Sequence, residues 1–206
     1  MTDITWGVPT LAETNALLAE HHYLGPSKSG GKHLFGGWVD GKLVAAQVWR
    51  SVTARRLNSP AILELSRWCL TPPAGANAGS RMHKYAVAEL RKSSEVEILV
   101  SYSDPSAGHG GSLYRACNWL WAPTWHRLRP PPSGLGSWGD GVRQEVKDRW
   151  VFPVQRRPDP AVVDLFRVTD RAAIRKHLAS PEYAEVTHRW LPLVPWADYE
   201  ISKETP

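Results

Sequence analysis

The spacing of hydrophobic positions changes along the first 60 residues, and it predicts a helix followed by a β-hairpin. Residues 10–21 open with a Thr-x-x-Glu capping box and continue with leucines at near-helical spacing, which is typical of a helix. Two apolar runs, 34–39 and 43–52, flank an Asp-Gly pair at 40–41. Because Asp-Gly favours the tight turns of hairpins, these runs predict two antiparallel strands.

A strand, a helix and a further strand are expected next. Residues 62–70 alternate in polarity as a strand does, and strict alternation places Arg67 opposite Trp68. A loop of small residues over 71–80 leads into a helix that runs to about residue 92, followed by an apolar strand at 96–101. A strand-helix-strand crossover implies a parallel pair. The sequence therefore predicts an α/β (α+β) fold, with a mostly antiparallel sheet and flanking helices.

The last third of the chain differs from the rest in composition. A short helix is predicted at 112–118 and a last strand at 149–154, with a stretch rich in Pro, Gly and Ser between them. Further on, 170–178 has the pattern of a basic helix. We expect one domain over residues 1–156 and a C-terminal extension, 157–206, packed on its core.

Composition suits a nucleic-acid partner without requiring one. The 206 residues carry a net charge of +5 and include 11 tryptophans against 3 phenylalanines. Cations neutralise phosphate and flat rings stack on bases, although Trp is also an ordinary core residue. No apolar run reaches membrane-spanning length and no signal peptide is evident, so a soluble cytoplasmic protein is expected. Cys69 and Cys117 are too few for a disulfide framework and should stay reduced.

The small-residue loop before the second helix is a candidate phosphate site. Backbone N–H groups at a helix N-terminus attract anions, and Arg81 adds a cation in the first turn. A purely structural turn has the same pattern, and the G-K-[ST] element of nucleotide-hydrolysing loops is absent. The residues that would hold a cofactor phosphate are Gly75, Asn77, Gly79, Ser80 and Arg81.

A second candidate site follows the apolar strand. Loops at the carboxyl ends of parallel strands gather into a crevice, so Asp104, His109 and Tyr114 are expected to face one pocket. Asp104 fits a base, a metal ligand, an orienting group or a simple turn cap. If His22 and Tyr23 also converged there, Asp104 and Tyr114 would complete a hard nitrogen and oxygen set suited to iron.

Six motifs in order resemble the phage Mu Mom family of DNA-modification proteins. They are His22-Tyr23-Leu24-Gly25, Leu65-Ser66-Arg67-Trp68, Ser101-Tyr102-Ser103-Asp104-Pro105, Gly108-His109-Gly110-Gly111, Leu113-Tyr114-Arg115-Ala116-Cys117-Asn118-Trp119 and Lys147-Asp148-Arg149-Trp150. The resemblance implies the GNAT fold of N-acyltransferases over residues 1–156. It also implies that the chain modifies N6 of adenine in DNA, leaving a carbamoylmethyl group that protects phage DNA from restriction.

The resemblance further implies roles for individual residues. An acyl-coenzyme A donor such as acetyl-CoA would lie over residues 74–81, and iron would be held by the His22, Tyr23, Asp104 and Tyr114 set. The implied catalytic residues are Asp104, Tyr114, His22, Tyr23, Ser66 and Arg67. Because N6 is paired in duplex DNA, the adenine must leave the stack, and a stacking wall is expected from Trp119, Trp121, Trp125 or Trp138.

Two other functions remain open at this point. An acyltransferase of the same fold would act on an amine of a small molecule or a protein, and it would lack salt-dependent DNA binding. A basic DNA-binding module without catalysis would have no pocket behind the Asp104 loop.

Overall fold

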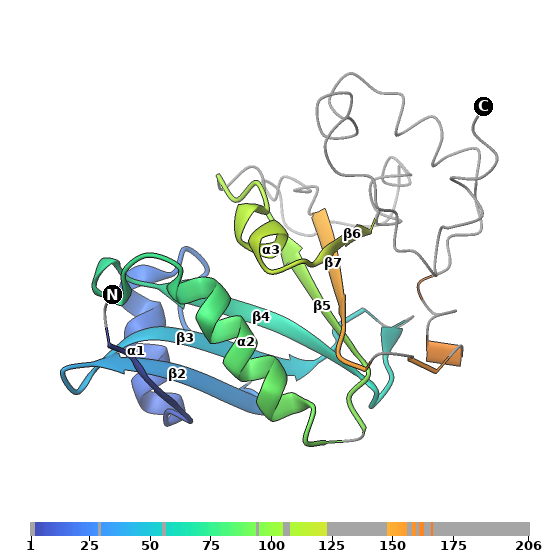
Figure 1. Cartoon of the computed structure of the whole chain (residues 1–206), viewed down its shortest axis with the longest axis horizontal. Helices are drawn as coiled ribbons and strands as arrows, with labels where there is room; N and C mark the ends of the chain where they lie inside the picture. Colours follow the sequence, from blue (N-terminus) through green and yellow to red (C-terminus); the bar gives the residue numbers. More distant parts are fainter. Residues whose placement is uncertain are drawn as a thin grey trace, which may run out of the picture.

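One mixed sheet organises the part of the chain that the computed structural model describes, namely residues 3–28, 30–54, 57–93, 95–104, 108–122, 148–155, 158–159, 161–162 and 166. Its strands are β1 (Thr5–Gly7), β2 (His33–Val39), β3 (Lys42–Ser51), β4 (Ile62–Leu70), β5 (Ile98–Ser103), β6 (Leu120–Ala122) and β7 (Asp148–Pro153). Within the described residues they form seven strands in the order β1-β2-β3-β4-β5-β7-β6 (Figure 1). Of the strand pairs among the described residues only β4–β5 is parallel, which confirms the predicted fold class.

Helix α1 (Leu11–His21) covers one face of this sheet. The predicted capping box is present, because the Thr10 hydroxyl accepts the Glu13 N–H at 3.1 Å and the Glu13 carboxylate accepts the Thr10 N–H at 2.8 Å. Leu18 packs from the helix against Val48 and Cys69 of the sheet. The capping residues therefore set where α1 begins, and its buried leucines fix it to the sheet.

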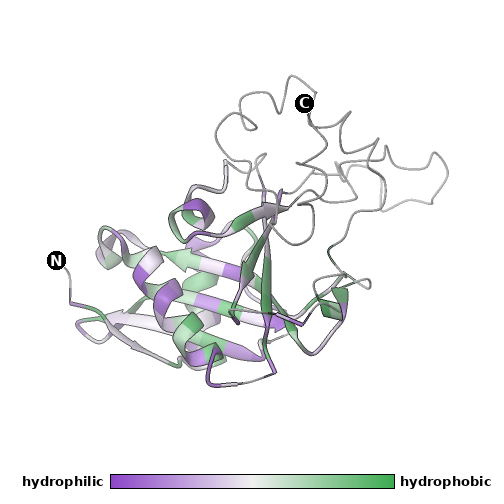
Figure 2. Cartoon of the chain, turned by 45° about the vertical axis from the view of Figure 1, so that its right-hand side comes forward, coloured by the Kyte–Doolittle hydropathy of each residue, from purple (hydrophilic) through white to green (hydrophobic). Residues whose placement is uncertain are grey.

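Helix α2 (Ala78–Leu90) covers the opposite face. Its residues Met82 and Ala86 pack with Ala45, whereas the neighbouring Ala46 packs with α1. Since successive residues of a strand point to opposite faces, the two helices lie on opposite sides of the sheet. Figure 2 shows alternating hydrophilic and hydrophobic bands on α2, as expected of a helix with one buried side.

The predicted hairpin is also confirmed, with Asp40 and Gly41 both at positive φ in its two-residue turn. Neither cysteine forms a disulfide, as expected, and both are buried. None of the described helices combines the length and the apolar character needed to cross a membrane.

The short strands β1 and β6 were not predicted. The predicted helix at 170–178 lies outside the described residues, and the division at residue 157 stays a prediction.

A bulge in β4 corrects the predicted alternation of its side chains. Val48 of β3 pairs with Arg67 but Trp49 pairs with Leu65, so Ser66 is an extra residue in the ladder. As a result Trp68 packs in the cluster that contains Leu65, under α2. The expectation of strict alternation through this strand was wrong, because a bulge shifts every later residue to the other face.

The parallel strands β4 and β5 stop pairing with each other at this bulge. Their pairing begins at Ile62 with Ile98 and ends at Leu65 with Ser101. Beyond it, β4 continues alongside β3 alone and β5 continues alongside β7. Figure 1 shows the two strands spreading apart, with β5 running towards α3 (Ser112–Ala116). The chain thus opens a gap in the middle of its own sheet.

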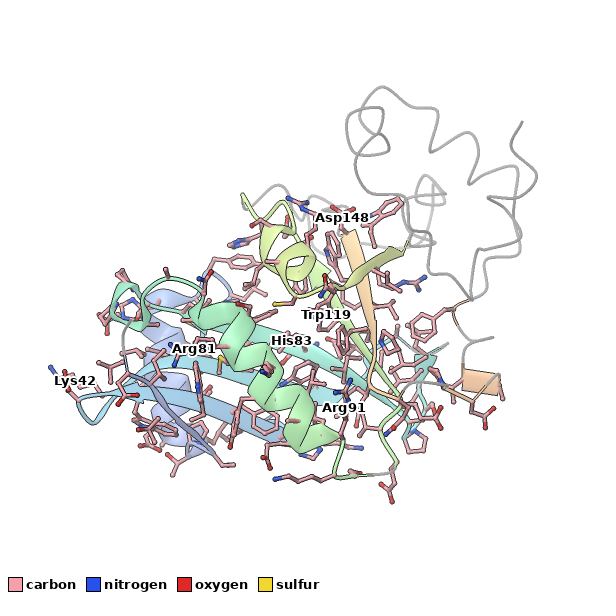
Figure 3. All side chains as sticks on the ribbon, in the orientation of Figure 1. Lys42, Arg81, His83, Arg91, Trp119 and Asp148 are labelled. Carbon is pink, nitrogen blue, oxygen red and sulfur yellow. The ribbon has the colours of Figure 1, made fainter. Side chains whose placement is uncertain are left out.

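His83 is a titratable side chain buried in the hydrophobic core under α2. It projects from α2 and is 5% exposed, between the rings of Trp119 at 5.5 Å and Phe152 at 4.7 Å (Figure 3). Neither ring nitrogen has a hydrogen-bond partner within the described part of the chain. Burial lowers the pKa of His83 to about 4, with a smaller effect from Arg91, so the imidazole stays neutral near pH 7.

Replacement of this imidazole by a benzene ring tests the assignment. The unfolded imidazole binds a proton below about pH 6.5, whereas the folded one does so only near pH 4, so stability is lost as the pH falls through this window. Between pH 7 and pH 5 the unfolding free energy of the wild type should fall by about 2 kcal/mol more than that of His83→Phe. Urea denaturation at both pH values measures this difference. Equal losses in the two proteins would contradict a buried neutral His83.

Candidate functional site

A cavity of about 260 Å³ lies in the gap between β4 and β5. Residues from the end of α1, from the two parting strands, from the loop after β5 and from α3 line it. All six residues expected to be catalytic are among them, namely His22, Tyr23, Ser66, Arg67, Asp104 and Tyr114. The expected convergence of distant segments on one pocket is therefore present, while the chemical role of each residue stays a prediction.

Among the described residues, two carboxylates line this cavity, and they differ in their surroundings. The Glu64 carboxylate accepts hydrogen bonds from Arg50 Nε at 3.0 Å, from the Thr53 N–H at 3.0 Å and from the Thr53 hydroxyl at 2.7 Å. Glu64 is thus committed to holding β3 and β4 together. Asp104 comes directly after β5 and is 1% exposed, and its carbonyl oxygen accepts the His109 N–H at 3.0 Å, which closes the loop. Asp104 is therefore the carboxylate deepest in the gap, and its role as a base stays a prediction.

Tyr114 closes the inner end of the gap. Its ring stacks on Trp150 with 5.4 Å between centroids, and its hydroxyl lies 2.8 Å from Ser101 Oγ. Because the Ser101 hydroxyl donates to the Leu65 carbonyl at 2.9 Å, Tyr114 is the donor to Ser101. Burial raises the pKa of Tyr114 to about 12 and outweighs the opposing effect of the Ser101 bond, so the phenol keeps its proton at neutral pH.

His22 is a neutral hydrogen-bond donor. Its Nδ1 accepts the Leu24 N–H at 3.1 Å, which leaves the ring proton on Nε2. Burial is the largest cause that lowers the pKa of His22 to about 4, and the charges of Arg67 and His109 add to it. This imidazole can therefore donate a proton in a hydrogen bond, but near pH 7 it does not carry charge.

Arg67 supplies positive charge beside His22. The bulge turns its side chain towards the end of α1, where Nε donates to the Gly25 carbonyl at 3.1 Å and Nη1 donates to the Ser66 carbonyl at 2.8 Å. Burial and the nearby Arg50 lower the pKa of Arg67 from its ordinary value, yet a guanidinium remains charged. No ion pair of Arg67 occurs among the described residues, and the nearby Tyr23 and Glu64 oppose the lowering of its pKa.

The expected iron ligands do not fit a metal in this arrangement. A metal-bound tyrosine is a phenolate, whereas the Tyr114 hydroxyl donates its proton to Ser101. A histidine that binds a metal through Nε2 carries its proton on Nδ1, but Nδ1 of His22 accepts a backbone hydrogen bond. No group of three or more His, Cys, Asp or Glu side chains in the described ranges is placed to hold a metal ion. We derive no step through iron.

The candidate phosphate loop lies beside the cavity rather than in its lining. Gly75 and Asn77 both have positive φ, and the Asn77 side chain does not cap α2, so the first helical turn is open to an anion. Gly79 packs closely against Leu113 of α3, because a Cβ at Gly79 would collide with the Leu113 side chain. Leu113 in turn lines the cavity. Ser80 bonds back to the Asn77 carbonyl. Arg81 is stacked on a ring of β1, with its guanidinium 5.7 Å from Trp6 (Figure 3).

The expected stacking wall of tryptophans is wrong for the two members that the structure describes. Trp119 and Trp121 are 4% and 5% exposed, and Trp121 donates to Asp148 at 3.0 Å. Both belong to the hydrophobic core under α2. Trp125 and Trp138 lie outside the described residues. The aromatic side chains exposed at the cavity are instead Tyr23 and His109.

Sequence comparison agrees with the motifs that meet in this cavity. The model of the Mom protein family matches residues 7–128. The chain belongs to the Mom protein family. No curated protein matches its sequence.

Solved structures show the fold of this Mom-family chain. The ribosomal-protein-S18-alanine N-acetyltransferase from Escherichia coli is 15% identical, with a TM-score of 0.52 over 76% of this chain and 97% of its own. A GNAT-family acetyltransferase from Streptococcus pneumoniae is 12% identical, with a TM-score of 0.52 over 74% and 100%. A putative acetyltransferase from Salmonella typhimurium, solved with its cofactor acetyl-CoA, is 11% identical, with a TM-score of 0.50 over 76% and 98%. The fold is therefore GNAT-like.

The Gly-His-Gly-Gly segment contains a matched pair of glycines for a stability test. Gly108 and Gly111 have φ of +79° and +75°, but a Cβ at Gly108 would meet nothing within 4 Å, whereas one at Gly111 would collide with the Trp150 ring. Gly108→Ala should cost about 1 kcal/mol for the left-handed backbone alone. Gly111→Ala should cost about 2 kcal/mol more, because the ring under Tyr114 must move. Urea denaturation measures both, and equal losses would contradict the packing of Trp150 against Gly111.

Proposed function

We propose that this Mom-family protein is a transferase that attaches a carbamoylmethyl group to N6 of adenine in DNA, a modification that protects the DNA from restriction. The observation that carries the proposal is the meeting of a buried aspartate, a neutral histidine and an arginine in the cavity between β4 and β5. Membership of the Mom family and the GNAT-like fold support group transfer to an amine.

The chemistry requires a base at N6. The lone pair of this amine is delocalised into the purine ring, so the amine is a poor nucleophile until its proton is removed. As N6 attacks the CH2 carbon of the donor's carbamoylmethyl group, the N6–C bond forms and the bond from that carbon to its leaving group breaks. The electron pair departs with the leaving group, and the N6 proton passes to the carboxylate of Asp104. Nε2–H of His22 is available to bind an acceptor nitrogen of the purine.

The depth of Asp104 implies that the adenine leaves the helix. In duplex DNA, N6 is paired inside the stack, out of reach of a carboxylate that is 1% exposed. Extrusion costs a few kcal/mol, which contacts in the cavity and with the phosphates offset. Arg67 provides a phosphate contact at the cavity, and the basic net charge of +5 adds attraction at longer range.

Attack of N6 on a thioester such as acetyl-CoA would give an N6-acyl group. A carbamoylmethyl product requires a donor whose leaving group is bonded to the CH2 carbon next to the amide, and in this proposal that donor binds through the phosphates of a coenzyme A-like group. The structure from Salmonella typhimurium contains acetyl-CoA as its cofactor. Here the uncapped N-terminus of α2 fits the phosphates of such a donor, because its N–H groups and dipole favour negative charge. Gly75, Asn77, Gly79, Ser80 and Arg81 would surround them. A bound donor would supply the carbamoylmethyl group and the leaving group on its CH2 carbon.

The cavity supports this function better than the two rivals. Arg67 suits the phosphates that DNA brings, whereas an amine substrate without a phosphate would leave this cation without a ligand. A DNA-binding module without catalysis predicts no pocket behind the Asp104 loop, and such a pocket is present.

Nucleoside mass spectrometry tests the proposal directly. Plasmid DNA from cells that express the chain should contain deoxyadenosine heavier by one carbamoylmethyl group in place of hydrogen. Asp104→Asn keeps the shape of the side chain but cannot accept the N6 proton, so its yield should fall at least about 100-fold. Glu20→Gln, which removes an exposed carboxylate on α1, serves as the control and should keep wild-type yield. Unmodified DNA with the wild type, or full modification with Asp104→Asn, would contradict the proposal.

A further inference from the structure

Aromatic rings from two distant segments meet at the mouth of the cavity. Tyr23, just after α1, stacks on His22 with 5.0 Å between centroids and an interplanar angle of 18°. On the other segment, His109 of the loop after β5 lies 4.7 Å from Tyr23 at 43°. All three residues line the cavity. The three rings are therefore in contact across the opening, stacked at His22–Tyr23 and tilted at Tyr23–His109, and we refer to His22, Tyr23 and His109 as the rim stack.

The rim stack is exposed to an extent that its role in folding does not explain. Tyr23 is 50% exposed and the adjacent Leu24 is 43% exposed. Among the described residues, the exposed large hydrophobic side chains are these two together with Val8 and Leu11. Two of the four thus lie side by side at the cavity mouth. Aromatic surface in this position suits a flat apolar ligand that arrives from solvent.

Charge identifies the kind of ligand. Arg67 lies beside His22, raises the local positive potential and, in the described part of the chain, forms hydrogen bonds to carbonyl oxygens rather than an ion pair. A guanidinium has five N–H donors, and Arg67 uses two of them in these bonds. A flat ring next to an available cation is the combination that binds a nucleobase together with its phosphate.

We propose that the rim stack binds the nucleobase next to the extruded adenine in the DNA strand, with Arg67 on the intervening phosphate. This inference rests on the proposed function, because extrusion of the adenine removes the stacking partner of its neighbour. The extruded base passes the rim to reach Asp104, so the base that stays at the rim is the adjacent one. Tyr23 and His109 are positioning residues in this account, and the ring of Tyr23, which contacts both histidines, holds the rim stack together through its ring rather than its hydroxyl.

Binding to two matched single strands tests the rim stack. One strand carries a central adenine flanked by thymines, and the other has abasic sites in place of every base except that adenine, so the two have equal phosphate charge. Fluorescence anisotropy with the full chain should give about tenfold tighter binding to the first strand. Tyr23→Ala and His109→Ala should abolish most of this ratio. Val8→Ala, which removes exposed apolar surface outside the cavity lining, should keep it.

Tyr23→Phe separates a stacking ring from a hydroxyl ligand. The phenylalanine keeps the ring face, so the ratio between the two strands should stay near the wild-type value. A metal-ligand or hydrogen-bonding role of the hydroxyl predicts that Tyr23→Phe behaves like Tyr23→Ala. That result overturns the inference, as does a wild-type ratio near one or a ratio that Tyr23→Ala leaves unchanged.

The assay also separates this inference from the proposed function, since strand binding requires no group transfer. A chain that leaves adenine unmodified but shows a ratio dependent on the Tyr23 ring contradicts the proposed function alone. A chain that modifies adenine with a ratio independent of Tyr23 contradicts the rim stack alone.

Discussion

The separation of two parallel strands is the constraint on which the site depends. Beyond the Leu65–Ser101 pair, β4 is drawn along β3 by the bulge at Ser66, while β5 is drawn along β7. The opened sheet exposes backbone that the side chains must satisfy, and Ser101 does this by joining the Leu65 carbonyl to Tyr114. The same bulge turns Arg67 towards the end of α1. A local irregularity in one strand thus creates the cavity and supplies part of its chemistry.

Several of the titratable groups around the cavity are paired with one another or kept neutral by burial. Glu64 and Arg50 neutralise each other, and burial keeps His22 uncharged. In the proposed function, Asp104 deep in the gap takes the N6 proton and Arg67 nearer the end of α1 contacts a phosphate. A carboxyl group at the inner end and a cation on the outer side match a base that enters first and a backbone that stays outside.

Local signals in the sequence predicted the elements well, but not the features that distinguish the site. The capping box of α1, the Asp-Gly turn and the parallel crossover are each encoded within a few residues, and the crossover indicated that Asp104 and Tyr114 face one pocket. The bulge at Ser66 has no such signal, because neither Gly nor Pro marks it and only the pairing with β3 produces it. Likewise, composition cannot distinguish a buried Trp119 from an exposed Tyr23, since tertiary packing decides which aromatic ring meets solvent. The proton position on His22 depends on the backbone of Leu24, which no side-chain motif contains.

A crystal structure of the chain bound to a DNA duplex that contains a single adenine tests the account most directly. It should show that adenine out of the stack, in the gap between β4 and β5, with N6 within about 3.2 Å of the Asp104 carboxylate. An adenine that stays stacked, or one bound elsewhere on the chain with N6 out of reach of Asp104, would contradict the account.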